Sequence, residues 1–210
     1  MKYLSLFLPV VILFACNQQP KEERLPFLGN TIYEGTDTIY HTVQDFQLVD
    51  QDSSIVTNET FSNRIYVADF FFTSCPTICP KMKAQMLRVY DKYKDNEEFG
   101  ILSHTIDPAY DTVALLKDFA DRLGVSSDTW KFLTGDQDYI YDLAEGSYIS
   151  LADEDSNAPG GFVHSGAFLL VDKDRRIRGF YDGTVPEQVD VLMYDIERLL
   201  KEYQPAAEAQ

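Results

Sequence analysis

Basic residues are scarce in this chain of 210 residues, where 18 Lys and Arg stand against 34 Asp and Glu, a formal charge of −16. Such a surface repels phosphate groups, so nucleic acid and anionic lipid headgroups are poor partners for the folded body. Cationic surfaces and metal cations are compatible with it, although solubility is the commoner reason for an acidic exterior. With 45% hydrophobic and 13% aromatic residues, the chain can form one globular domain.

The chain also lacks an internal repeat, and the apolar run near its start, LFLPVVILFA, is too short to span a bilayer. The stretch LFAC at 13–16 is similar to the lipobox of bacterial lipoproteins, although Phe14 is bulkier than usual. We therefore expect a signal peptide over 1–15, lipid on Cys16 and a tether over 16–37, with an ordinary secretory signal as the alternative. Either places the protein in the cell envelope of a bacterium, outside the cytoplasm, and we expect the lipid-anchored protein to face the periplasm.

Apolar patterns predict an α/β fold for residues 38–203. Alternation near 38–48 predicts short strands of an edge hairpin, and the apolar run 65–72 is typical of a central strand covered on both faces. Further strands are predicted at 99–106, 130–133, 165–171 and 177–181. The order of strands and helices predicts a sandwich with a central mixed sheet, parallel at its centre and antiparallel at an edge, flanked by helices.

Helix boundaries are predicted from capping residues. Pro80 suits the first helical position, with Cys79 as the cap, and Asp111 suits the cap of the next helix. The segment 184–187, Thr-Val-Pro-Glu, is typical of a capping box for the last helix. The polar stretch 152–161 predicts a loop, and the tail 204–210 is expected to be frayed.

Cysteine is rare too, and two of the three cysteines lie together in TSCPTICPKM at 73–82. Cys75 and Cys79 follow a predicted strand, and ligands of open α/β sheets bind at the carboxyl ends of strands. The positive end of the following helix is expected to lower the pKa of both sulfurs. The pair is therefore interpreted as an activated dithiol that suits redox chemistry or a soft metal ion, with a structural disulfide as the alternative.

A metal needs a further ligand, and the chain has three histidines. His164 follows a Gly-Gly pair and precedes a strand, so it can swing over the cysteines. His104 lies near the carboxyl end of the neighbouring strand, whereas His41 belongs to the outlying hairpin and is not expected to approach. Two thiolates and one imidazole favour copper over zinc, because structural zinc sites usually gather four Cys or His ligands.

Four segments together resemble the Sco (SenC) family of membrane-anchored copper proteins: DFFFTSCPTICPKM, IDPAYDT, WKFLTGD and VHSGAFLLVDKDRRIRGFYDG. They occur in the family's order over about residues 38–201. The CPxxCP motif followed by a lone histidine before a strand is specific. The resemblance implies a thioredoxin-like fold and copper, as Cu(I), Cu(II) or both, bound by Cys75, Cys79 and His164. It also implies a role in delivering copper to, or reducing cysteines of, the binuclear copper site of cytochrome c oxidase.

The resemblance implies supporting residues and partners as well. The family's Asp-Pro-x-x-Asp segment corresponds to Asp107, Pro108 and Asp111, whose carboxylates are candidates to support the ligands or dock a partner, while a turn and a helix cap explain them equally well. His104 is a candidate for an additional ligand. The implied partners are the copper-site subunit of the oxidase, a copper donor chaperone or thioredoxin-like reductant, and the membrane through the lipid anchor.

The alternative function is a thiol-disulfide oxidoreductase or peroxiredoxin-like redox enzyme of the cell envelope, which the same dithiol and fold would support. Against it, the cysteine spacing is one residue wider than C-x-x-C, and no Trp precedes Cys75. A redox or copper sensor is a third hypothesis that differs from the metallochaperone only in its partner. Whether the protein is an enzyme stays open at this point.

Overall fold

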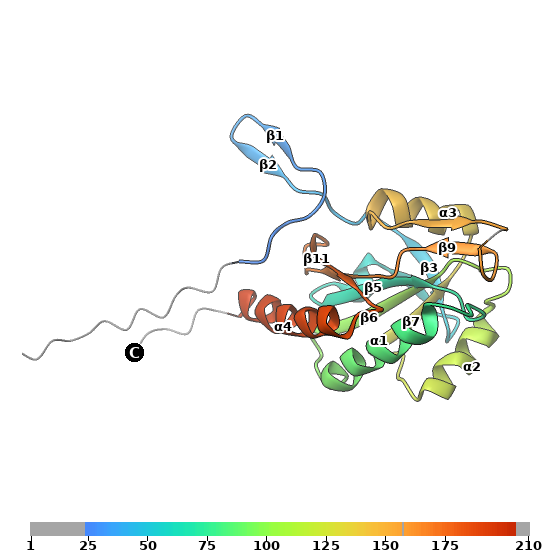
Figure 1. Ribbon diagram of the computed structural model, residues 1–210. Helices are drawn as coiled ribbons and strands as arrows, with labels where there is room; N and C mark the ends of the chain where they lie inside the picture. Colours follow the sequence, from blue (N-terminus) through green and yellow to red (C-terminus); the bar gives the residue numbers. More distant parts are fainter. Residues whose placement is uncertain (1–23, 157, 205–210) are drawn as a thin grey trace, which may run out of the picture.

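The computed structural model describes residues 24–156 and 158–204 (Figure 1). The predicted signal peptide over 1–15 and the predicted lipid attachment at Cys16 lie outside the described residues. Within the part that is described, no helix combines the length and the apolar character needed to cross a bilayer.

A seven-stranded mixed sheet forms the centre of the body, in the order β11-β10-β5-β6-β7-β3-β4. Its strands are β3 (Gln47–Asp50), β4 (Ile55–Thr57), β5 (Ile65–Phe71), β6 (Phe99–Thr105), β7 (Trp130–Thr134), β10 (Ala167–Val171) and β11 (Ile177–Asp182). The three central strands β5, β6 and β7 are parallel, and the flanking strands β10 and β3 are antiparallel to them. Every residue of β5 and β6 is buried. For β5, this confirms the prediction of a central strand covered on both faces.

Four α-helices flank this sheet: α1 (Cys79–Tyr93), α2 (Val113–Leu123), α3 (Gln137–Asp142) and α4 (Pro186–Glu202). In Figure 1, α1, α2 and α4 lie below the sheet and α3 lies above it. A 3₁₀ turn (Asn58–Phe61) precedes β5, and a π-helical turn (Leu143–Ser147) follows α3. The predicted α/β sandwich with a mixed sheet is therefore confirmed.

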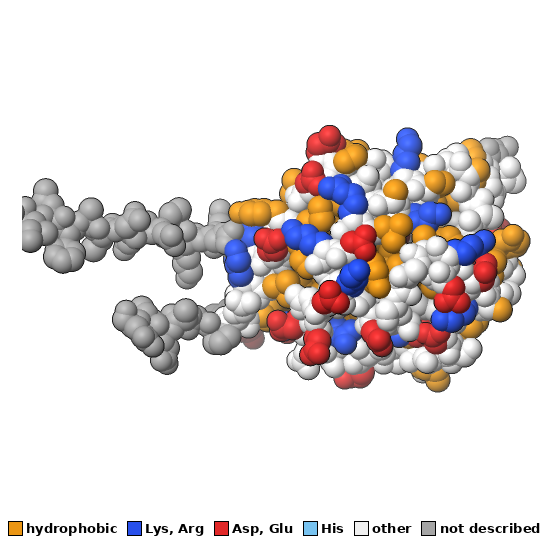
Figure 2. Space-filling model, turned by 90° about the horizontal axis from the view of Figure 1, so that it is seen from below, with side chains coloured by type: hydrophobic (Ala, Val, Ile, Leu, Met, Phe, Trp, Pro, Cys, Tyr) orange, Lys and Arg blue, Asp and Glu red, His pale blue; other side chains and the backbone are white. Residues whose placement is uncertain are grey.

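The face seen from below carries acidic and basic side chains interspersed over α1 and α4 (Figure 2). The exposed pairs Arg88–Asp190 and Lys92–Glu197 join the two helices. Exposed ion pairs of this kind contribute no more than about 1 kcal/mol each, so apolar burial along the helices provides most of the packing energy. The large negative charge of the chain is thus not gathered into a single-sign patch on this face.

Two helix caps differ from the prediction. Helix α1 begins at Cys79 itself, with Ile78 as its N-cap and Pro80 in its first turn, so the prediction of Cys79 as the cap is wrong by one residue. Helix α2 is capped by Thr112, because the carboxylate of Asp111 accepts hydrogen bonds elsewhere.

The predicted capping box at the start of α4 is also wrong. The helix begins at Pro186 without a hydrogen bond from a capping side chain. The hydroxyl of Thr184 donates to the carboxylate of Asp182 at the end of β11, so it is not available to the helix. The fixed φ of proline then sets the first helical residue.

Two small antiparallel pairs lie outside the central sheet: β1 (Ile32–Glu34) with β2 (Asp37–Ile39), and β8 (Ala152–Glu154) with β9 (Phe162–His164). The polar stretch 152–161, which we predicted to be a loop, therefore contains a strand. Its backbone pairs with β9, which the polar composition could not indicate. We call β8 and β9 with their connection the ribbon, and His164 is its last paired residue.

Part of the expected tether contacts the body. Leu25 is buried, and the carbonyl groups of Leu25 and Pro26 accept hydrogen bonds from the buried guanidinium of Arg178 on β11. Glu202, at the end of α4, pairs with Arg178 and accepts a hydrogen bond from the N–H of Leu25. The segment from residue 24 onward is thus fixed to the body, and the domain boundary expected at residue 38 falls inside the β1–β2 pair.

Candidate metal centre

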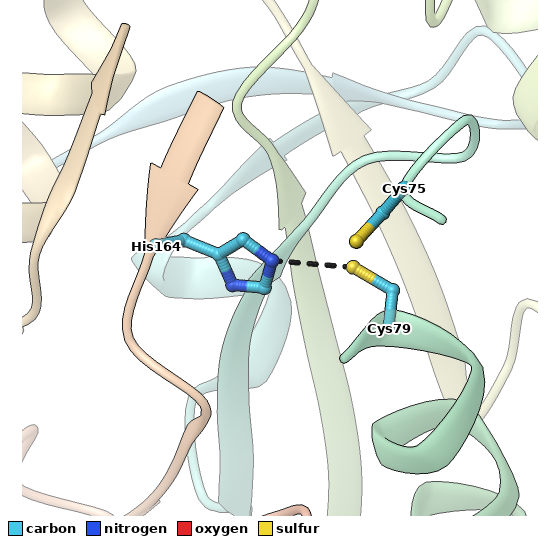
Figure 3. A group of neighbouring side chains, drawn as sticks. All are labelled: Cys75, Cys79 and His164. Carbon is cyan, nitrogen blue, oxygen red and sulfur yellow. Dashed lines mark hydrogen bonds between the residues drawn. The ribbon is translucent and has the colours of Figure 1, made fainter. Parts of the chain in front are cut away.

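The two cysteines lie just beyond the carboxyl end of β5, where the chain enters α1 (Figure 3). The N–H of Cys75 donates to the carbonyl of Phe72, which turns the loop back toward the strand. Cys79 opens α1. Both side chains are free thiols, and the residues are 8% and 9% exposed. The pair therefore occupies the end of the sheet that the sequence indicated.

His164 reaches the cysteines from the ribbon, as Figure 3 shows, with its Nε2 3.2 Å from the Sγ of Cys79. Its Nδ1 lies 3.1 Å from the carbonyl oxygen of Ser165. A carbonyl only accepts, so Nδ1 carries the proton and the lone pair of Nε2 faces the sulfurs. One ligand atom from each of Cys75, Cys79 and His164 lies within 4.8 Å of the others, the one such cluster found among the described residues.

The two thiols differ in their electrostatic environment. Burial tends to raise the pKa of Cys75, but hydrogen bonds from the backbone N–H of Thr77 and from Cys79 outweigh it, so the pKa lies below the ordinary thiol value. The pKa of Cys79 is raised, first by burial and then by the neighbouring Cys75 sulfur. The prediction that the helix end lowers the pKa of both sulfurs is therefore wrong for Cys79.

The imidazole of His164 is held in its neutral form. Burial lowers the pKa of His164, because a charged ring would lose its hydration in the interior. The edge of its ring also meets Phe72, with ring centroids 5.9 Å apart. A neutral imidazole offers its lone pair to a metal ion, and metal binding releases protons from thiols that are still protonated.

Asp111 fixes the loop that leads to Cys75. It is fully buried, and its carboxylate accepts hydrogen bonds from the N–H and the hydroxyl of Thr73 and from the hydroxyl of Thr105. The N–H of Thr73 lies 3.0 Å away. Thr73 precedes Cys75 by two residues, and Thr105 ends β6, so one carboxylate ties the cysteine loop to the neighbouring strand. It touches none of the three candidate ligands directly.

The hydrogen bonds of Asp107 are made to residues near it in the sequence and not to the metal cluster. Its carboxylate accepts a hydrogen bond from the N–H of Tyr110, and its own N–H donates to Thr105. Burial raises the pKa of Asp107, and the charges of Asp111 and Glu154 add to this effect. These contacts make Asp107 part of a turn.

His104 lies outside the cluster. It is fully buried in the sheet, stacked on Phe70 with ring centroids 5.0 Å apart and tilted against Tyr148 at 5.2 Å. Burial lowers its pKa to about 4. The structure does not bring this candidate for an extra ligand to the cysteines. His41 is also elsewhere, with its Nε2 2.7 Å from the carbonyl oxygen of Ser147.

A buried acid behind the cysteines was missed in the sequence. Asp69 on β5 is 5% exposed and accepts a hydrogen bond of 2.5 Å from the hydroxyl of Ser103, which in turn accepts one from the indole N–H of Trp130. Burial raises the pKa of Asp69 to about 7. Asp69 and both cysteines line one cavity of about 60 Å³. The signal was an acid inside the apolar run IYVADFFF, since buried acids are costly without a partner.

Comparison with known proteins gives consistent matches. The SCO1/SenC family profile matches residues 35–201. A SCO1 protein homolog from Bacillus subtilis (strain 168) is 32% identical over 163 residues, which cover 77% of this chain and 84% of the relative. The crystal structure of a SCO1/SenC family lipoprotein from Bacillus anthracis is 27% identical and covers 76% of this chain and 95% of its own, with a TM-score of 0.70.

Two further solved structures share the fold. One is BsSco, described as a member of the Sco family of cytochrome c oxidase assembly proteins in which a disulfide switch was identified. It is 31% identical and covers 77% of this chain and 94% of its own, with a TM-score of 0.67. The other is Arabidopsis thaliana ScoI with copper bound, which is 22% identical. The match covers 77% of this chain and 99% of the Arabidopsis chain, with a TM-score of 0.64. The predicted thioredoxin-like fold is confirmed by these likenesses.

Proposed function

Because the chain belongs to the SCO1/SenC family, we propose that it is a copper metallochaperone that binds copper through Cys75, Cys79 and His164. Its proposed recipient is the binuclear copper site of cytochrome c oxidase. The observation that carries the proposal is the convergence of two sulfurs and one imidazole nitrogen within 4.8 Å. Two thiolates and one neutral imidazole form a soft donor set of the kind that copper accepts.

The surroundings of the three ligands suit a cargo that is held and then released. Thiols bind metals as thiolates, and Cys75 is predisposed to that form by its lowered pKa, while Cys79 releases its proton on binding. All three residues are less than a tenth exposed, which keeps water and competing ligands away. Release to a recipient therefore needs a contact that opens the site.

The test is a titration of the reduced protein with Cu(I) against a competing chelator. We expect one copper per chain. His164→Ala should weaken binding by about a hundredfold or more, since losing even a residue that only orients a ligand costs about 10–100-fold. His104→Ala is the matched control and should leave affinity unchanged, because that ring is stacked on Phe70. No uptake in the presence of a mild chelator would overturn the proposal.

The unequal thiols favour a second activity, reduction of the recipient's cysteines. The Cys75 thiolate would attack a disulfide sulfur of the recipient, forming a mixed disulfide and releasing one thiolate. Cys79 would then attack the Cys75 sulfur, releasing the second thiolate and leaving a Cys75–Cys79 disulfide, so that two electrons pass to the recipient. A thioredoxin-like reductant would regenerate the pair.

The redox activity is tested with Cys79→Ser. This variant should accumulate the mixed disulfide with a small disulfide substrate, whereas Cys75→Ser should not react. Rapid turnover of peroxide in metal-free buffer would instead favour the peroxiredoxin-like alternative over copper delivery. If neither variant changes the reaction, the dithiol takes no part in disulfide exchange.

Membrane attachment through Cys16 completes the proposal. The similarity of LFAC at 13–16 to a lipobox supports it, and so does the description of the Bacillus anthracis relative as a lipoprotein. We expect Cys16→Ser to move the protein from the membrane fraction to the soluble envelope fraction and to abolish labelling by a fatty acid. Retention of both properties would contradict a lipid on this residue.

A further inference from the structure

The two thiols have a second set of neighbours besides His164. The cavity of about 60 Å³ against them is also lined by Met82 and Met86 of α1. Among the described residues that line it, His164 does not occur. Figure 3 shows the imidazole reaching the sulfurs from the ribbon, while Cys79 stands at the start of α1. The imidazole therefore contacts the cysteine pair without lining this cavity.

Met82 is placed nearer to the thiols than Met86 is. Residues three apart on a helix lie on the same face with their Cβ atoms about 5–6 Å apart, and Met82 follows Cys79 by three. Met86 follows Met82 by four residues, about 6 Å farther along the axis. Both methionines are buried, at 2% and 1% exposure. Because the side chain of Met82 is unbranched and lines the same cavity as the sulfurs, it can change rotamer toward them.

The donor atoms on the cavity wall differ in chemical type. The thioether of methionine is a neutral, soft donor that Cu(I) accepts beside thiolates. The carboxylate of Asp69 and the hydroxyl of Ser103 are hard oxygen donors and are already hydrogen-bonded to one another. Met82 is thus the best-placed soft donor of the cavity for a metal already held by Cys75 and Cys79.

His164 is carried by a less firmly held element than the cysteines are. The ribbon is a two-stranded sheet separate from the central sheet, and it packs on the core through Ala152 and Phe162, whereas β5, which leads to Cys75, is buried along its whole length. Near His164, the N–H of Ser165 donates to the carbonyl of Leu151, and the hydroxyls of Ser150 and Ser165 form a hydrogen bond. These two bonds join the ribbon to the preceding turn. A partner that draws the ribbon aside removes the imidazole and leaves both sulfurs in place.

Resting on the proposed copper site, we propose that Met82 is a reserve ligand whose Sδ binds Cu(I) when His164 leaves. One copper–nitrogen bond breaks and one copper–sulfur bond forms. Both exchanged donors are neutral, so no proton or electron moves. The ion stays three-coordinate while the ribbon is open, and a recipient's thiolate can then displace a neutral thioether more readily than either thiolate.

X-ray absorption at the copper edge of the Cu(I)-loaded full chain tests this assignment. The wild type should show two sulfurs and one nitrogen, and His164→Ala should show three sulfurs. The double variant His164→Ala with Met82→Leu should fall to two sulfurs. His164→Ala with Met86→Leu is the matched control and should keep three. Met-to-Leu changes conserve volume and cost less than about 1.5 kcal/mol, and circular dichroism with thermal unfolding checks that each variant is folded.

Affinity gives a second readout. In chelator competition, adding Met82→Leu to His164→Ala should weaken Cu(I) binding by a further tenfold or so, and adding Met86→Leu should not. If copper in His164→Ala has two sulfur ligands and Met82→Leu does not change its affinity, Met82 is not a reserve ligand. That result would not contradict the proposed copper site of Cys75, Cys79 and His164. Three sulfurs in the wild type would also overturn it, because Met82 would then be a resident ligand. A wild type that takes up no copper would instead overturn the proposed function.

Discussion

Asp69 and Asp111 are both buried acids near the cysteines. Asp69 lines the same cavity as the cysteines, Asp111 contacts the loop before Cys75, and their hydrogen bonds give them different roles. Asp111 accepts three hydrogen bonds from two threonines and holds the loop before Cys75. Asp69 accepts one from Ser103 and faces the cavity behind the thiols. The three donors around Asp111 therefore make it an organiser of the cysteine loop, whereas burial raises the pKa of Asp69 to about 7.

The pH dependence of stability should report Asp69. Burial raises its pKa from 3.8 to about 7, so its contribution to stability is full below pH 3.8 and is lost as pH rises through about 7. The shift corresponds to about 4 kcal/mol. His104, with a pKa lowered to about 4, acts in the opposite direction between pH 4 and 6.5. Subtracting the unfolding free energy of Asp69→Asn from that of the wild type isolates the contribution of Asp69. This difference should fall by about 4 kcal/mol between pH 4 and 8.

Denaturant unfolding of the reduced, metal-free protein at several pH values measures this difference. His104 and the other titrating groups are common to both proteins and cancel in the subtraction. An unfolding free-energy difference that stays constant from pH 4 to 8 would show that Asp69 is ionised throughout.

Asp111→Ala should destabilise the protein and weaken copper binding together. The change leaves the Thr73 N–H and the Thr105 hydroxyl without their acceptor, at a cost of about 1–3 kcal/mol for each buried donor. Loosening of the loop should lower copper affinity about 10–100-fold. Asp107→Asn is the matched control, because its carboxylate contacts its own turn. Equal effects of the two changes on affinity would contradict the role given to Asp111.

The sequence indicated which residue types form the site better than it indicated their state. A cysteine pair after an apolar strand located Cys75 and Cys79, since that order puts them at the end of the sheet. The choice of His164 over His104 came from the family resemblance, because it depends on where the ribbon folds back onto Cys79, which lies 85 positions earlier in the chain. The raised pKa of Cys79 was missed because it depends on burial in three dimensions.

Among the elements, the apolar strands were predicted closely and the ribbon was not. The continuous apolar run of β5 indicates a central strand, and every residue of that strand is buried. Gly124 caps the end of α2 with a positive φ, which glycine adopts readily. Strand β8 pairs with β9 and buries Ala152, whereas its other two residues, Asp153 and Glu154, are exposed, which accounts for its polar sequence. The element that carries one candidate ligand is therefore the one with the weakest pattern in the sequence.

Gly160 tests whether the ribbon's position sets copper affinity. A Cβ on Gly160 would lie 2.9 Å from the ring of Phe72, whereas a Cβ on Gly161 would meet nothing within 4 Å. Both residues have φ near +86°, so an alanine at either carries similar backbone strain. We expect Gly160→Ala to shift the ribbon and weaken Cu(I) binding several-fold more than Gly161→Ala, measured by chelator competition. Equal affinities would mean that the ribbon tolerates the shift.

At the scale of the whole molecule, the two ends of the described chain meet far from the metal centre. Helix α4 begins just after Gly183, whose N–H donates to Gly166 between the ribbon and β10. It then runs for 17 residues, about 25 Å, to Glu202. There Arg178, fully buried, joins Glu202, Asp172 and the carbonyl of Leu25. Residue 24, where the described chain begins, thus lies at the other end of α4 from the cysteines.

Arg178→Met should separate stability from copper binding. It leaves the buried carboxylate of Asp172 without its guanidinium partner, and breaking a buried pair costs about 3–5 kcal/mol. Copper stoichiometry and affinity of the folded protein should be unchanged, because the pair lies at the other end of α4. A loss of copper affinity in samples shown to be folded would contradict the separation.

The most direct test of the metal centre is the optical spectrum after addition of Cu(II) to the reduced protein. Thiolate-to-copper charge-transfer bands should appear, saturate at one copper per chain, vanish in Cys75→Ser and Cys79→Ser, shift in His164→Ala and remain in His104→Ala. Bands that persist unchanged in Cys75→Ser, or a wild type without such bands, would contradict copper binding by these three residues.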